Sequence, residues 1–223
     1  MCLRRGCPAL GKPLVEIGVV LLWVLSMALF QKLLNHLVRS GRISEFAARK
    51  AAHVGIGLWI LPLALLVRRW YLAAIPIMMV LAANTSANRK RGQLRGGWVR
   101  LFPVATFAAP LALILYCWSR GRTDLVVPAV LTMTIGDTAA ALAGMRFGRH
   151  KIPWTGKSLE GAAANWLASF ATLWAAGAFL REIHPALLLV PAFAVAVLEA
   201  VLPGEWDNPL AIMLLIGCLA ALS

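Results

Sequence analysis

The chain has 223 residues, of which 61% are hydrophobic and only 14% are charged. A soluble domain is about 45–50% apolar and about 25% charged, so this composition excludes an ordinary soluble domain and indicates an integral membrane protein. The formal charge of +13 does not indicate a nucleic-acid partner, because Lys and Arg cluster in short connectors between apolar runs, as they do beside membrane helices.

Apolar runs recur along the whole chain. A helix needs about 20 apolar residues to cross the hydrocarbon core, with a range of roughly 17–25. The runs that meet this requirement, the last of them weakly, are 14–34, 51–67, 70–87, 101–118, 125–145, 160–180, 186–203 and 208–223. We therefore expect an all-α fold, a polytopic transmembrane bundle of seven or eight helices that forms a single membrane domain over residues 1–223.

The basic residues predict an orientation. When the connectors are taken alternately, the side that carries the segment 137–161 holds the larger share of the 22 Lys and Arg residues. The positive-inside rule places that side in the cytoplasm. We therefore expect a multi-pass protein of the cell (inner) membrane with an active-site loop around 137–161 that faces the cytoplasm. The sequence carries no signal for the oligomeric state.

The first polar cluster lies where the second apolar run begins. In EFAARKAAHVGIG, Arg49 and His53 are four residues apart, and Lys50 stands three before His53. Residues at these spacings share one face of a helix. The cluster is consistent with part of a binding site and equally with ordinary residues at the membrane interface.

Asp137 stands in the otherwise apolar run VLTMTIGDTAAALAG. On insertion scales an Asp at the centre of a membrane helix costs about 2.5–3.5 kcal/mol, so such residues tend to face a polar cavity or a partner. One interpretation is an acid at a helix end near the interface. The interpretation that we favour is a ligand for a divalent cation, because these ions prefer hard oxygen donors.

A basic loop with several glycines follows this acid. Its cationic side chains are Arg146, Arg149, His150, Lys151 and Lys157. Its glycines, which let a backbone approach an anion closely, are Gly144, Gly148, Gly156 and Gly161. Ser158 is a predicted N-cap of the next helix, whose free backbone amides would point at the loop.

These features predict a phosphate site. The alternative is an ordinary positive-inside loop, which explains the cations but not the acids on each flank, Asp137 and Glu160. The segment TGKS is not the end of a P-loop, because Lys151 occupies the position of the first glycine of that motif.

A second acidic group lies near the carboxy terminus, in LEAVLPGEWDN. Glu199 stands near the end of an apolar run, where a carboxylate needs a polar neighbour. Asp207 and Asn208 follow after a Pro-Gly turn. We expect these residues to join the site of Asp137.

The segment GDTAAALAGMRFGRHKIPWTGKSLEG resembles the signature of the phytol, polyprenol and dolichol kinases, a family of membrane proteins. The family pattern is Gly-Asp, a basic loop with glycines, and Lys-Ser-x-Glu-Gly, and it is matched here at Gly136 and Asp137 and at 157–161. RKAAH is similar to the family's Arg-Lys-x-x-His element, and EAVLPGEWDN to its Glu followed by Asp-Asn. The three elements occur in order over residues 45 to 210.

The resemblance implies a kinase that requires Mg²⁺ and transfers a phosphoryl group from CTP to a lipid alcohol. It implies Asp137 and Asp207 as metal ligands, and Lys157, Lys151 and Arg49 as contacts of the triphosphate. The remaining residues implied at the nucleotide are Lys50, Gly148, Gly156, Ser158, Gly161 and Asn208. Glu160, Glu199 and His53 are three alternatives for the group that orients or deprotonates the alcohol.

Three other functions stay open. A phosphatidate cytidylyltransferase has a similar central pattern, but its longer carboxy-terminal signature is absent here, where LPGEWDN stands instead. A kinase that phosphorylates diacylglycerol with CTP is compatible with all three elements. A small lipid transporter would spread polar residues through several helices at mid-depth, whereas here they gather near one face.

Overall fold

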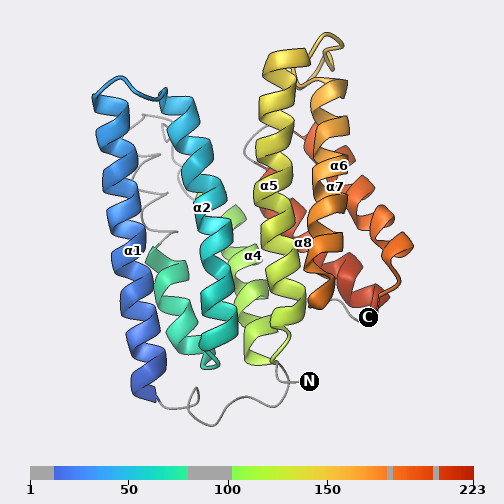
Figure 1. Cartoon of the computed structure of the whole chain (residues 1–223). Helices are drawn as coiled ribbons and strands as arrows, with labels where there is room; N and C mark the ends of the chain where they lie inside the picture. Colours follow the sequence, from blue (N-terminus) through green and yellow to red (C-terminus); the bar gives the residue numbers. More distant parts are fainter. Residues whose placement is uncertain (1–12, 80–101, 180–182, 203–205) are drawn as a thin grey trace. The chain divides into compact units, whose positions relative to one another are not determined.

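The computed structural model describes residues 13–79, 102–179, 183–202 and 206–223. In these ranges the protein is an all-α helical bundle (Figure 1), which confirms the predicted fold class. The chain forms two compact units. One is made of the described residues up to Ala105 together with Leu115–Gly121, and the other of Thr106–Ile114 together with Arg122–Ser223. The single membrane domain expected from the sequence stays a prediction.

The amino-terminal unit contains α1 (Pro13–Arg39), α2 (Glu45–Leu66) and a shorter helix at Trp70–Met79. Helices α1 and α2 lie side by side and are joined by a short turn (Figure 1). Helix α2 begins where it does because the Ser44 hydroxyl accepts a hydrogen bond of 3.1 Å from the Ala47 amide and so caps the first turn.

Polar contacts tie the amino-terminal unit together at the middle of α1 and near its amino-terminal end. The Trp23 indole donates to the Trp59 carbonyl, and the Trp59 indole donates to Ser26 Oγ, each at 2.8 Å. The buried Glu16 carboxylate lies 2.9 Å from the Arg69 guanidinium and also accepts from the Arg69 amide. A buried charge needs such a partner, so this pair fixes the connector after α2 against α1.

Helix α4 (Phe102–Ser119) contributes residues to both units. The carboxy-terminal unit is completed by α5 (Thr123–Phe147), α6 (Leu159–Ala175), α7 (Leu189–Val201) and α8 (Asp207–Leu222), with short 3-10 turns at Ala176–Ala178 and Pro185–Leu188. Helix α5 packs against α6 and α8, and α7 packs against the same two helices. The first half of α5 is almost entirely buried, so α5 is the core helix of this unit.

Glycines bring α5 and α6 close together. A Cβ atom on Gly161 would lie 2.9 Å from the Ala140 carbonyl oxygen and 3.5 Å from Gly144 Cα. Small residues allow two helix backbones to approach in this way. The close approach lies next to the loop that joins α5 to α6.

Three helices in the described part of the chain, α1, α2 and α5, are long and apolar enough to cross a membrane, which is consistent with a membrane protein. Shorter apolar helices at Trp70–Met79, Ala108–Ser119, Pro185–Val201 and Asp207–Leu222 fall on other predicted spans. Part of the predicted span 70–87 lies outside the described residues. The number of membrane passes stays a prediction.

Candidate functional site

The loop between α5 and α6 folds back on itself. The Ile152 amide donates to the Lys157 carbonyl at 2.7 Å, and an isolated antiparallel bridge joins Lys151 to Ser158. Gly156 completes the turn at φ +71°, a conformation that side chains with a Cβ rarely adopt. The loop ends at Ser158, whose hydroxyl accepts a hydrogen bond of 3.1 Å from the Gly161 amide, which confirms the predicted N-cap of α6.

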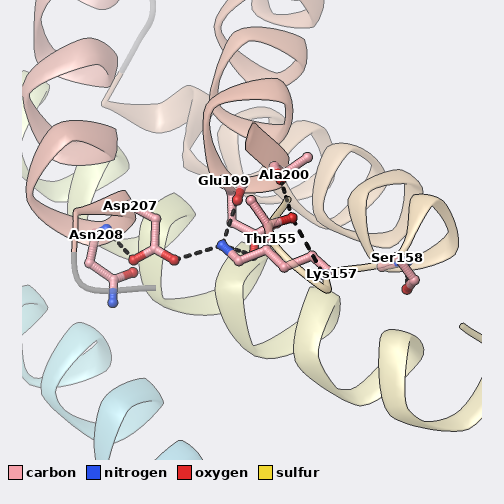
Figure 2. A network of polar contacts seen from close by, with 8 residues as sticks. Thr155, Lys157, Ser158, Glu199, Ala200, Asp207 and Asn208 are labelled. Atoms are coloured by element: carbon pink, nitrogen blue, oxygen red, sulfur yellow. Dashed lines mark hydrogen bonds and ion pairs between the residues drawn. The ribbon is translucent and has the colours of Figure 1, made fainter. Parts of the chain in front are cut away.

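The fold of this loop carries Lys157 to α7 and α8. The Lys157 ammonium lies 2.8 Å from Glu199 Oε1 and 2.8 Å from Asp207 Oδ2, and it also donates to the Glu199 carbonyl (Figure 2). The Glu199 carbonyl and Asp207 Oδ2 accept hydrogen bonds from the ammonium, and Glu199 Oε1 forms an ion pair with it. The side chains of Glu199 and Asp207 are only 11% and 7% exposed, so Lys157 neutralises two carboxylates that are nearly out of water.

The ion cluster also sets the charge state of Lys157. Burial alone would lower the pKa of this ammonium, but hydrogen bonds and charge interactions with Asp207 and Glu199 outweigh burial and raise the pKa above its ordinary value of 10.5. Lys157 is therefore a fixed positive charge at neutral pH.

Neighbouring contacts hold the lysine and the carboxylates in place. The Thr155 hydroxyl donates to the Ala200 carbonyl at 3.0 Å, which attaches the loop to the end of α7 (Figure 2). Asp207 Oδ1 accepts from the Asn208 amide at 2.7 Å, which leaves Oδ2 for Lys157. Sequence analysis did not single out Thr155, because a threonine in a turn has no pattern that marks it.

A small pocket opens beside this cluster, between α5, α6, α7 and α8. It is lined by Met133, Asp137, Asn165, Val195, Glu199, Asp207, Asn208 and Ala211. The space inside that a water-sized sphere can reach is about 10 Å³, which is roughly the room that one water molecule needs. A ligand larger than a water molecule or a single ion would therefore have to extend into the solvent beyond the pocket or displace side chains that line it.

The pocket joins the elements that the sequence suggested should meet. Asp137 from α5, Glu199 from α7, and Asp207 and Asn208 from α8 all line it. Asn165 of α6 lines it as well and was missed. An amide in the otherwise apolar run AAANWLAS is visible in the sequence, but whether it faces a pocket depends on how the helices pack. Three carboxylates within one pocket need a cation nearby, and Lys157 supplies part of that charge.

The residue types of the pocket fit Mg²⁺. Among the residues that the structure describes, no group of three or more His, Cys, Asp or Glu side chains converges as a protein-only metal cage would require. Mg²⁺ does not need such a cage, because it keeps several waters and binds through one or two carboxylates together with substrate phosphates. Asp137 and Asp207 supply carboxylates of the kind that this mode of binding uses.

Glu160 lies apart from the pocket lining. Its carboxylate contacts His150 Nδ1 at 2.7 Å and accepts from the His150 amide at 3.2 Å. A hydrogen bond from its own backbone amide, followed by the contact with His150, lowers the pKa of Glu160 from 4.5 to about 2. Such a carboxylate is a poor proton acceptor at neutral pH, so Glu199 is the better candidate for a base.

The loop glycines and the remaining predicted basic residues are not among the residues that line the pocket. Cβ atoms on Gly148 and Gly161 would lie 2.7 Å and 3.1 Å from Ser158 Oγ, so packing already explains their size. Lys151 is exposed on the loop. The residues predicted on α2, namely Arg49, Lys50 and His53, belong to the amino-terminal unit, and their roles stay predictions.

Comparison of the chain with protein families, with curated proteins and with solved structures finds no match.

Proposed function

We propose that the protein is a CTP-dependent kinase that phosphorylates the hydroxyl group of an isoprenoid lipid alcohol of the phytol, polyprenol or dolichol type. The observation that carries the proposal is the contact of Lys157 with both Glu199 and Asp207, beside a pocket that Asp137 also lines. Two of the three elements that resemble the kinase family thus converge at one pocket, although 50 positions separate Lys157 from Asp207.

The chemistry of phosphoryl transfer agrees with this set of residues. The alcohol oxygen bonds to the γ-phosphorus, the bond to the β–γ bridging oxygen breaks, CDP leaves, and the hydroxyl proton passes to a carboxylate, which we assign to Glu199. Asp137 and Asp207 would hold Mg²⁺, and the chemistry that this ion would supply is neutralisation of charge on the phosphates. Lys157 would exchange a carboxylate for a phosphate oxygen when the nucleotide binds, because it already contacts two carboxylates and a carbonyl group.

The acceptor is a lipid in this proposal because α7 combines a polar end with an apolar exposed face. Val190, Phe193 and Val197 of this helix are exposed, whereas Glu199 on the same helix is buried at the pocket. A lipid hydroxyl that arrives laterally would pass from such an apolar face to the carboxylates. We propose that the protein spans the inner membrane several times and that the pocket faces the cytoplasm, where CTP and Mg²⁺ are available.

The experiment that tests the proposal uses the purified protein in detergent with Mg²⁺, CTP labelled at the α- or the γ-phosphate, and a panel of phytol, farnesol, longer polyprenols, diacylglycerol and phosphatidate. Label from the γ-phosphate on an isoprenoid alcohol is the expected result. Label on diacylglycerol instead would identify a diacylglycerol kinase. Cytidine on phosphatidate would identify a cytidylyltransferase, and no transfer to any lipid would favour a transporter.

Two variants connect the activity to the pocket. Asp137→Asn and Lys157→Ala should each abolish transfer from CTP while the bundle stays folded. Transfer at near wild-type rates by either variant would contradict the assignment of the site.

A further inference from the structure

Asn165 is a buried amide that lines the pocket from α6. Only 2% of its surface is exposed, and it faces the same space as Asp137, Glu199 and Asp207. Its side chain can present either a carbonyl oxygen, which accepts hydrogen bonds or binds metals, or an NH₂ group, which only donates. The contacts of the amide decide between the two.

The carbonyl oxygen of Asn165 has two close neighbours, Ser169 and Gly136. Ser169, one turn further along α6 and fully buried, donates its hydroxyl to Asn165 Oδ1 at 2.9 Å. The same oxygen lies against Gly136 of α5, where an added Cβ would be only 2.8 Å from it and 2.7 Å from Ser169 Oγ. The space at Gly136 therefore admits the Ser169–Asn165 pair. Because Oδ1 accepts the hydrogen bond from Ser169, the NH₂ group is the end of the amide that can serve a ligand in the pocket.

We propose that Asn165 contacts the anionic part of the ligand, with its NH₂ group as a donor to a phosphate oxygen. The inference rests on the proposed function. It adds an uncharged hydrogen-bond donor to a pocket that three carboxylates line. Such a donor suits this place, because it attracts a phosphate without cancelling the charge that attracts a metal ion. Ser169 is a positioning residue, since it acts through Asn165.

The test compares the binding of CTP and of Mn²⁺, a spectroscopic substitute for Mg²⁺, to the purified full-length protein in detergent. Asn165→Ala should weaken CTP binding by roughly tenfold or more, as expected for a lost hydrogen bond to a charged group. Asn165→Asp should weaken CTP binding further while Mn²⁺ binding, followed by electron paramagnetic resonance, is unchanged or tighter. Ser169→Ala should weaken CTP binding by about threefold, because the amide can then turn over.

Thr172→Val is the matched control for Ser169→Ala. The Thr172 hydroxyl donates to the Ala168 carbonyl on the same helix, and Thr172 is not among the residues that line the pocket. This variant should bind CTP as the wild type does. Thermal unfolding of every variant in detergent identifies any variant that does not fold. If Asn165→Ala does not fold, the isosteric Asn165→Asp still tests the inference.

The outcomes distinguish failure of the inference from failure of the proposed function. Wild-type protein that binds CTP, with variants at Asn165 that bind it equally well, would overturn the inference and leave the proposed function standing. A parallel loss of CTP and Mn²⁺ binding in Asn165→Asp would overturn the donor role. Wild-type protein that binds no CTP would overturn both.

Discussion

Lys157 Nζ lies 2.8 Å from Asp207 Oδ2, although 50 positions separate the two residues in the sequence. Together with Glu199, which is on a third element, they form a cluster in which a loop lysine neutralises two largely buried carboxylates. The cluster joins the loop after α5 to α7 and α8, so it organises the pocket as well as contributing charge to it. Its removal should therefore affect both stability and ligand binding.

Lys157→Met is expected to lower the stability of the protein, because Glu199 and Asp207 then remain buried without their cation. Removing one partner of a buried ion pair costs about 3–5 kcal/mol. Lys151→Met is the matched control, since Lys151 is an exposed lysine of the same loop. Thermal unfolding in detergent measures both variants. An equal shift for the two variants would contradict a structural role for the cluster.

Glu160→Gln is expected to change the dependence of stability on pH. The pKa of Glu160 is lowered from 4.5 to about 2 in the folded protein, so its contribution to stability is present above about pH 4.5 and is lost as the pH falls through about 2. The difference in unfolding temperature between wild type and variant should shrink over this range. The other acidic residues titrate in both proteins, so their effect on the unfolding temperature largely cancels when the variant is compared with the wild type. A gap that is constant with pH would show that the carboxylate charge is not responsible.

Gly161→Ala is expected to destabilise the contact of α5 with α6. The added methyl group would lie 2.9 Å from the Ala140 carbonyl oxygen, which is part of a helix backbone and cannot move aside cheaply. Overpacking of this kind costs about 1–3 kcal/mol. Gly217→Ala in α8 is the control, because a Cβ there meets nothing within 4 Å and should leave stability unchanged or raise it by about 0.5–1 kcal/mol. Unfolding temperatures that rank the other way round would contradict the close approach.

Thr132→Val is expected to leave stability unchanged or to raise it. Thr132 Oγ1 is fully buried and has no hydrogen-bond partner within the described ranges, so its loss removes an unsatisfied polar group. Thr134 of the same helix is equally buried, but its hydroxyl donates to the Leu131 carbonyl at 3.1 Å. Thr134→Val should therefore cost about 1 kcal/mol. A larger loss of stability in Thr132→Val than in Thr134→Val would indicate that the Thr132 hydroxyl has a partner.

The sequence by itself determined the helical class of the protein. It also pointed to most of the polar residues that line the pocket. Apolar runs of this length predict helices because, inside a membrane, backbone polar groups must form hydrogen bonds with one another. The predicted helices in turn gave the fold class. Asp137 and Glu199 were visible because a carboxylate within an apolar run needs a polar environment whatever the fold is. Ser158 was predicted as an N-cap because capping depends only on residues within one turn.

Only the tertiary structure decided which of these side chains meet. The contacts of Lys157 with Glu199 and Asp207 depend on how α7 and α8 pack, and no local spacing encodes a distance between helices. Glu160 follows Lys157 closely in the sequence, yet it binds His150 because the start of α6 turns it toward the loop. Asn165 was missed for the same reason: helical periodicity does not distinguish an amide that faces a pocket from one that is buried between two helices, and the packing of α5 against α6 at Gly136 makes that choice.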